Sequence, residues 1–144
     1  PKDNLILGTD FRLAVADQRF VLGTEAAMSL FNDNILGGAI SKASLESEYD
    51  TTLPFDPAKL ENIFIINENM QPIKPGLSNL AYKAYLRAFF AGNMLNISYS
   101  AVGSAYNSLS ANYLQNDART FGFYDNLNLF GNSLSLNFGL KLIS

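Results

Sequence analysis

Residues 133–142 read Ser-Leu-Ser-Leu-Asn-Phe-Gly-Leu-Lys-Leu, in which apolar side chains alternate strictly with polar or small ones. Successive side chains of a β-strand point to opposite faces of the sheet, so this segment predicts a strand with one apolar and one polar face. Residues 119–130 alternate in a similar way and are separated from it by Gly131-Asn132, a pair typical of hairpin turns. The two segments therefore predict an antiparallel hairpin over residues 119–143.

The same design is found at the start of the chain, where residues 5–31 contain two alternating runs around Asp17-Gln18. A tight turn at this pair places Leu13 opposite Leu22 and brings both apolar rows to one side of the hairpin, as a correct register requires. We therefore predict a first hairpin over residues 5–31.

Residues 80–103 predict a second hairpin, with its turn at Gly92-Asn93. The expected register pairs Phe90 with Leu95 and Leu86 with Tyr99. A helix over residues 80–91 is the alternative, because Ala, Leu, Lys and Arg favour helices. The match between this segment and the alternating run at 94–103 favours the strand.

Two long connections separate the three hairpins, namely residues 32–79 and residues 104–118. The first contains four of the chain's five prolines and a charge-rich part from Lys42 to Glu68. Because proline interrupts both helices and sheet ladders, we predict a long loop with short ordered pieces. Within it, residues 60–66 predict either a short strand or one helical turn.

These patterns predict an all-β fold, an antiparallel up-and-down meander of about six long strands in three hairpins, as a single segment of a transmembrane β-barrel. Each arm has about 10 residues or more, the length that a tilted strand needs to cross a bilayer. Short turns at one end and long loops at the other are typical of outer-membrane barrels. The smallest common barrel has about eight strands. We therefore expect either two more strands from residues 32–79 or, as the favoured reading, a longer parent chain of which this one is a fragment.

The polar rows of the predicted strands carry charged side chains that we expect to face the lumen of the barrel. These are Asp10, Arg12, Glu25, Lys83, Arg87 and Lys141. Two interpretations stay open for them. They form a zone that selects or contacts a solute, or they form ion pairs that fill and rigidify a closed lumen.

Two further groups of residues bear on the membrane interpretation. Four aromatic side chains are candidates for the interfacial girdles of a barrel, with ordinary packing as the alternative: Tyr82, Tyr99, Phe121 and Tyr124. Asp125 falls on the apolar row opposite Phe138, where a charge facing lipid is costly. A β-bulge that turns it inward, a protein partner, or a soluble sheet with one wet face would each account for it.

Composition excludes several classes of function. Charged residues make up 16% of the chain, against roughly 25% in soluble proteins. The absence of cysteine and histidine excludes disulfides and Ser-His or Cys-His nucleophiles. The net charge of −3 gives no reason to expect a nucleic-acid partner.

Four acidic residues in the first long connection have carboxylate oxygens of the kind that bind calcium: Glu46, Glu48, Asp50 and Asp56. Their spacing matches no calcium-binding loop motif, so a solvated acidic loop is the favoured interpretation. Asp117 and Arg119 predict an ion pair that fixes the 104–118 loop. No cofactor and no metal are expected.

Residues 99–109 read Tyr-Ser-Ala-Val-Gly-Ser-Ala-Tyr-Asn-Ser-Leu, and residues 113–117 continue as Tyr-Leu-Gln-Asn-Asp before the next strand. This stretch resembles a loop of large outer-membrane β-barrel proteins of the Bacteroidota and Chlorobiota type. In those proteins a strand ends, a Tyr-x-Ser-Leu loop follows, and an Asn-Asp pair precedes the next strand. The resemblance covers residues 99–144, with Ala101 and Ser104 standing where Arg and Pro are expected. It implies the outer membrane of a diderm bacterium and a longer parent chain, and it implies no substrate and no catalytic residue.

The sequence therefore predicts a non-enzymatic outer-membrane β-barrel segment that acts in passage of solutes or as a scaffold at the cell surface. Outer-membrane lipid is the expected partner, with other outer-membrane or surface proteins as further candidates. The alternative is a soluble antiparallel β-sandwich binding module whose apolar face lies in an ordinary core. A barrel-type enzyme with a site in the lumen or at the rim is the third and least favoured hypothesis.

Overall fold

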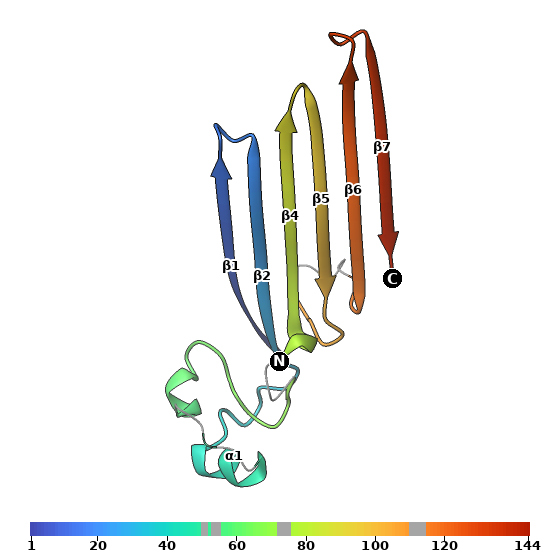
Figure 1. Cartoon of the computed structure of the whole chain (residues 1–144). Helices are drawn as coiled ribbons and strands as arrows, with labels where there is room; N and C mark the ends of the chain where they lie inside the picture. Colours follow the sequence, from blue (N-terminus) through green and yellow to red (C-terminus); the bar gives the residue numbers. More distant parts are fainter. Residues whose placement is uncertain (50–51, 53–55, 72–75, 110–114) are drawn as a thin grey trace.

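The computed structural model describes residues 1–49, 52, 56–71, 76–109 and 115–144, with Glu48 and Tyr49 described by their backbone alone. It contains one antiparallel sheet in which six long strands follow one another in chain order (Figure 1). They are β1 (Asp3–Val15), β2 (Phe20–Asn32), β4 (Leu80–Phe90), β5 (Asn93–Val102), β6 (Ala118–Leu129) and β7 (Leu134–Ile143). The remaining elements are short: β3 (Met70–Gln71), which pairs with β2, α1 (Lys42–Tyr49), η1 (Pro57–Leu60) and η2 (Leu77–Asn79).

The predicted all-β antiparallel meander of six long strands in three hairpins is confirmed. Residues 80–90 form β4, so the helical alternative for this segment is wrong. The sheet is open, with β1 and β7 as its two edges. Between residues 32 and 79, the described residues add only the two-residue β3 to the sheet, and not two further long strands. No helix in the described ranges is long and apolar enough to cross a membrane.

The first and third hairpins have the predicted registers. Leu13 pairs with Leu22 across the four residues 16–19, and Asp125 pairs with Phe138 across a turn centred on Gly131-Asn132. In the first turn the backbone N–H of Arg19 donates to the carbonyl of Ala16 over 3.0 Å.

The register predicted for the second hairpin is wrong by two residues. Phe90 pairs with Asn93 rather than with Leu95, and Leu86 pairs with Ile97 rather than with Tyr99. The turn is Ala91-Gly92, with φ angles of +49° and +79°, as the favoured two-residue hairpin turns require. Because a shift of two residues preserves the side-chain alternation, every side chain keeps the face that the alternation predicts.

The strands are staggered along the sheet, and Figure 1 shows the hairpin tips stepping upward from β1 to β7. Leu13 lies near the turn-side end of β1, whereas Leu140, in the same cross-strand row, lies near the loop-side end of β7. Leu13 is two residues from the turn-side end of β1 and Leu140 is six residues from that of β7, so the displacement is four residues over five strand steps. It corresponds to a strand tilt of about 29° for a rise of ~3.3 Å and a strand spacing of ~4.8 Å. Strands of β-barrels are tilted somewhat more, by about 35–45°.

The compact apolar core lies at the loop-side end of the sheet, where residues 33–71, which we call the loop unit, pack against β1 and β2 (Figure 1, lower part). Its buried members are Leu45, Phe64, Ile66 and Met70, against which Leu5, Leu30, Ile40 and Leu60 pack. The backbone N–H groups of Ile63 and Phe64 both donate to the carbonyl of Leu60 over 2.8 Å. Residues 60–64 therefore form one helical turn. Of the two structures predicted for residues 60–66, a short strand or one helical turn, the helical turn is the one observed.

A fully buried asparagine joins the loop unit to the end of β2. The Nδ2 of Asn32 donates to the carbonyl of Ile65 over 2.7 Å and to the Oδ1 of Asn67 over 2.9 Å. Its Oδ1 accepts from the backbone N–H of Asn34 over 3.1 Å. Buried polar groups must find such partners because each unpaired one is costly, so Asn32 fixes where the loop unit begins.

Candidate functional site

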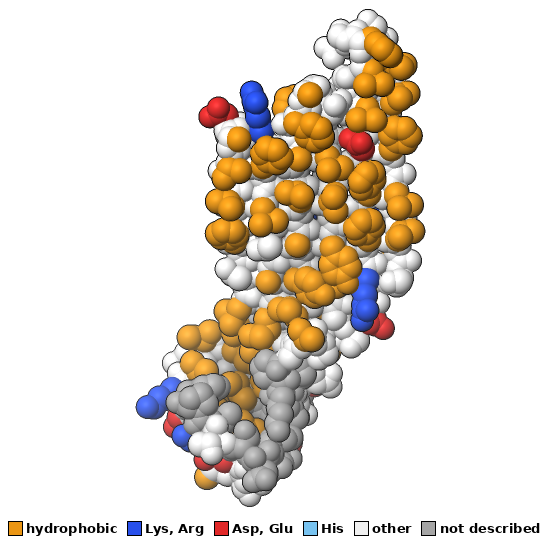
Figure 2. Space-filling view, in the orientation of Figure 1, with side chains coloured by type: hydrophobic (Ala, Val, Ile, Leu, Met, Phe, Trp, Pro, Cys, Tyr) orange, Lys and Arg blue, Asp and Glu red, His pale blue; other side chains and the backbone are white. Residues whose placement is uncertain are grey.

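The cross-strand register divides the sheet into two chemically different faces. One of them, which we call the apolar face, carries large aliphatic and aromatic side chains from all six long strands (Figure 2). Many of these side chains are well exposed, for example Phe11 at 57%, Phe138 at 54% and Leu7 at 52%. Other exposed members are Leu13, Val15, Phe20, Leu22, Leu86, Leu134, Leu136, Leu140 and Leu142. In the part of the chain that the structure describes, nothing covers the middle of this face.

The opposite face, the polar face, carries all six charged residues that the sequence predicts to face a lumen. Asp10, Glu25 and Lys83 occupy one cross-strand row on β1, β2 and β4. Arg87 lies near Lys83 on β4, since both side chains flank the ring of Tyr85. Arg12 and Lys141 lie apart from each other on the two edge strands. The structure thus brings four of the six together and shows no ion pair among the six.

Tyr85 lies flat on the polar face because Gly23 leaves room for it. The two residues are cross-strand partners, and a Cβ added at Gly23 would lie 2.2 Å from a ring carbon of Tyr85. Two cations flank the ring, with the Nζ of Lys83 5.6 Å and the Cζ of Arg87 5.1 Å from its centroid. Cations at such distances are attracted to the ring face. Tyr85 therefore forms a cluster of contacting side chains with Lys83 and Arg87 at the centre of the polar face.

We expect Gly23→Ala to lower the free energy of unfolding by about 1–3 kcal/mol, because overpacking forces the ring out of its site. The matched control is Gly8→Ala, since a Cβ there would meet only the carbonyl oxygen of Ala26 at 3.7 Å. Equilibrium denaturation of both variants in the same medium checks this. Equal stability of the two would contradict the packing of Tyr85 on Gly23.

The loop that follows β5 folds over the polar face rather than away from the sheet. Its segment 103–109 reaches across to β2, where the buried Oγ of Ser29 donates to the carbonyl of Asn107. The backbone N–H of Asn107 donates back to that Oγ over 2.9 Å. On β1 the Nδ2 of Asn4 donates to the carbonyl of Asn107 over 3.1 Å, and its Oδ1 accepts from the N–H of Leu109 over 3.2 Å. The loop-side end of the polar face is therefore covered by the chain's own loop.

The segment just before β4 contacts both the loop and β2. The N–H of Ala105 donates to the carbonyl of Ser78 over 2.7 Å, and the fully buried Asn79 donates to the carbonyl of Ser29 on β2 over 2.7 Å. Tyr106, between these contacts, is buried. The sequence does not indicate this docking, since Asn4 and Ser29 resemble any other polar residues of an alternating strand.

The aromatic candidates and Asp125 are distributed over both faces of the sheet. Tyr82 and Tyr99 lie together on the apolar face, with ring centroids 6.0 Å apart, and Phe121 is beside Tyr99. Tyr124 lies on the polar face and so does not belong with them. Asp125 lies on the apolar face, between Leu95 and Phe138, as the alternation predicts. Asp125 pairs in regular register with both neighbours, so no bulge turns it inward.

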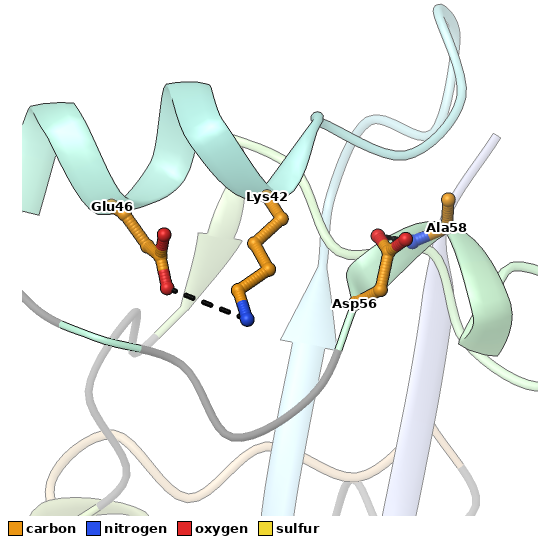
Figure 3. Close-up of polar contacts among 4 residues, drawn as sticks. All are labelled: Lys42, Glu46, Asp56 and Ala58. Carbon is orange, nitrogen blue, oxygen red and sulfur yellow. Dashed lines mark hydrogen bonds and ion pairs between the residues drawn. The ribbon is translucent and has the colours of Figure 1, made fainter.

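The acidic group that we interpreted as a solvated loop rather than a calcium site is divided among different contacts. Glu46 forms an ion pair with Lys42 over 3.7 Å, and Asp56 accepts from the N–H of Ala58 at the start of η1 over 3.2 Å (Figure 3). Asp50 and the side chain of Glu48 lie outside the described residues. Lys42–Glu46 is the one ion pair between described residues, so Asp117 and Arg119 do not form the predicted pair.

Comparisons with protein-family models, with curated proteins and with solved structures find no match for this chain. The resemblance of residues 99–144 to outer-membrane barrel proteins therefore stays a prediction. The two faces of the sheet, one apolar and exposed and the other polar, are the features of this chain that bear on function.

Proposed function

We propose that this chain forms part of the wall of an outer-membrane β-barrel, with its apolar face against lipid and its polar face toward the interior. In this proposal the role is non-catalytic, either passage of polar solutes or support of partners at the cell surface. The observation that carries the proposal is the wide exposure of the apolar face. The chain's own loop packs on the loop-side end of the polar face. The loop unit packs on Leu5 and Leu30 at the same end of the apolar face, and large apolar side chains on the rest of that face stay exposed.

This exposure is the reverse of what water favours. A soluble domain places its loops and second layer over apolar side chains, because burying a large apolar side chain contributes about 1.5–3 kcal/mol. A soluble monomer rarely exposes a contiguous apolar patch larger than a few hundred Å². An apolar face spanning six strands therefore supports contact with lipid hydrocarbon.

The dimensions of the strands support the same proposal. The long strands contain 10 to 13 residues. At a tilt of about 29°, ten residues span about 29 Å, which matches the hydrocarbon thickness of a bilayer. Two long edges, β1 and β7, are available for pairing with further strands, and barrels leave no such edge open.

Asp125 is the residue that fits this proposal least well. It lies near the middle of β6 on the apolar face. One acidic side chain at the bilayer midplane costs about 2 kcal/mol or somewhat less. The free energy gained by placing the many apolar side chains of the same face in lipid is larger than this cost. Asp125 therefore does not contradict the membrane proposal by itself.

The test is the location and solubility of the protein. We expect it in the outer-membrane fraction of the cell that makes it, and we expect the isolated chain to give β-type circular dichroism only with detergent or lipid. A monodisperse chain that unfolds cooperatively in plain buffer would contradict the proposal. That result would favour the soluble β-sandwich binding module.

A further inference from the structure

A hollow of about 360 Å³ lies at the loop-side margin of the apolar face. One cross-strand row supplies its floor and two of its walls, with Tyr82 on β4, Ala101 on β5 and Arg119 on β6. Ala101 is small and buried, so the two longer side chains stand on either side of a gap. Tyr99 and Asp117 also line the hollow.

The two charged groups of this hollow are not used within the part of the chain that the structure describes. Arg119 and Asp117 are both exposed and lie two positions apart, yet they form no ion pair with each other or with any described residue. The hollow therefore offers a guanidinium and a carboxylate next to two half-exposed tyrosine rings.

We infer that this hollow binds the headgroup of a zwitterionic phospholipid, with its phosphate on Arg119 and its ammonium group toward Asp117. The inference rests on the proposed function, because it requires the apolar face to lie in lipid. The planar guanidinium donates two parallel hydrogen bonds to a phosphate. The carboxylate and the tyrosine rings attract a cation.

The position of the hollow favours a lipid over a free phosphate compound. Tyrosine side chains gather at the level of lipid headgroups, where one end of the side chain is apolar and the other is wet. The hollow adjoins Phe121, which is the cross-strand partner of Tyr99, and the apolar face continues from there across β6 and β7. Acyl chains of a bound lipid would therefore lie on apolar side chains while the headgroup stays in the hollow.

The experiment uses the full chain folded in detergent micelles and follows its thermal unfolding on addition of short-chain phosphatidylethanolamine. We expect the lipid to raise Tm of the unchanged chain, and we expect Arg119→Gln to weaken the apparent affinity about tenfold, since a charge-assisted contact is lost. Arg12→Gln is the matched control, because Arg12 is an exposed arginine on the polar face. It should respond like the unchanged chain.

Two further arms identify the ligand. Asp117→Asn should lose the preference for phosphatidylethanolamine over phosphatidylglycerol while both lipids still bind. Free phosphoethanolamine, which has no acyl chains, should have little effect. Equal responses of the Arg119→Gln and unchanged chains would overturn the inference, and so would equal stabilisation by free phosphoethanolamine. A chain that folds in micelles but shows no lipid effect overturns this inference alone, whereas a chain that folds only in plain buffer overturns the proposed function as well.

Discussion

Leu7→Arg is expected to reduce insertion of the chain into phospholipid vesicles by tenfold or more. Leu7 lies near the middle of β1 on the apolar face and is 52% exposed, so the new guanidinium would face the hydrocarbon of the bilayer. A charge at that depth costs about 2–4 kcal/mol. Protection of the inserted strands from added protease measures the fraction of inserted chain.

The neighbouring residue provides the control for this experiment. Gly8 lies on the polar face, where an added Cβ would make only an ordinary contact with the carbonyl oxygen of Ala26 at 3.7 Å. Gly8→Arg therefore introduces the same charge on the opposite side of the same strand. We expect this variant to insert like the unchanged chain. Equal insertion of both variants would show that the two faces have been assigned to the wrong environments.

Phe64→Ala is expected to unfold the loop unit locally and to leave the sheet intact. Phe64 is only 2% exposed and is the largest buried side chain of the loop unit. Truncating a buried phenylalanine costs about 3–5 kcal/mol, which is more than a small cluster with few other core residues can absorb. Hydrogen exchange should become fast for the amides of residues 60–66 and stay slow for those of β4 and β5.

Ile63→Ala is the matched control, since Ile63 is adjacent in sequence and 68% exposed. An exposed substitution of this kind changes stability by about 0.5 kcal/mol or less. Similar exchange patterns in the two variants would mean that residues 33–71 do not form a cooperative unit around Phe64.

Alternation along the chain was enough to predict the strands, because a sheet with one apolar and one polar face imposes a period of two on the sequence. The same property explains the error in the second hairpin. A pattern of period two is unchanged by a shift of two residues, so it cannot distinguish a turn at Ala91-Gly92 from one at Gly92-Asn93. The positive φ of Ala91, an unusual conformation for alanine, gave no signal in the sequence.

The loops were predictable only as loops. The contacts of Asn32 with Ile65 and of Ser29 with Asn107 join a strand to a loop segment that is distant in the sequence. No pattern among neighbouring residues indicates such a partner. Arg119 was interpreted as part of a loop pair with Asp117. Its place in a cross-strand row with Tyr82 and Ala101 follows only once the register of β5 and β6 is known.

The docking of residues 103–109 on the first two strands has a consequence for the order of folding. Its hydrogen bonds join described residues separated by 78 to 105 positions. We expect them to form late, because closing a long chain loop costs conformational entropy before the contact forms. They also require Asn4 and Ser29 to be on the same face at the same time. A first hairpin slipped by one residue would turn one of these side chains to the other side, and the loop would find only half of its site. Docking of residues 103–109 would therefore stabilise the first hairpin only in its correct register.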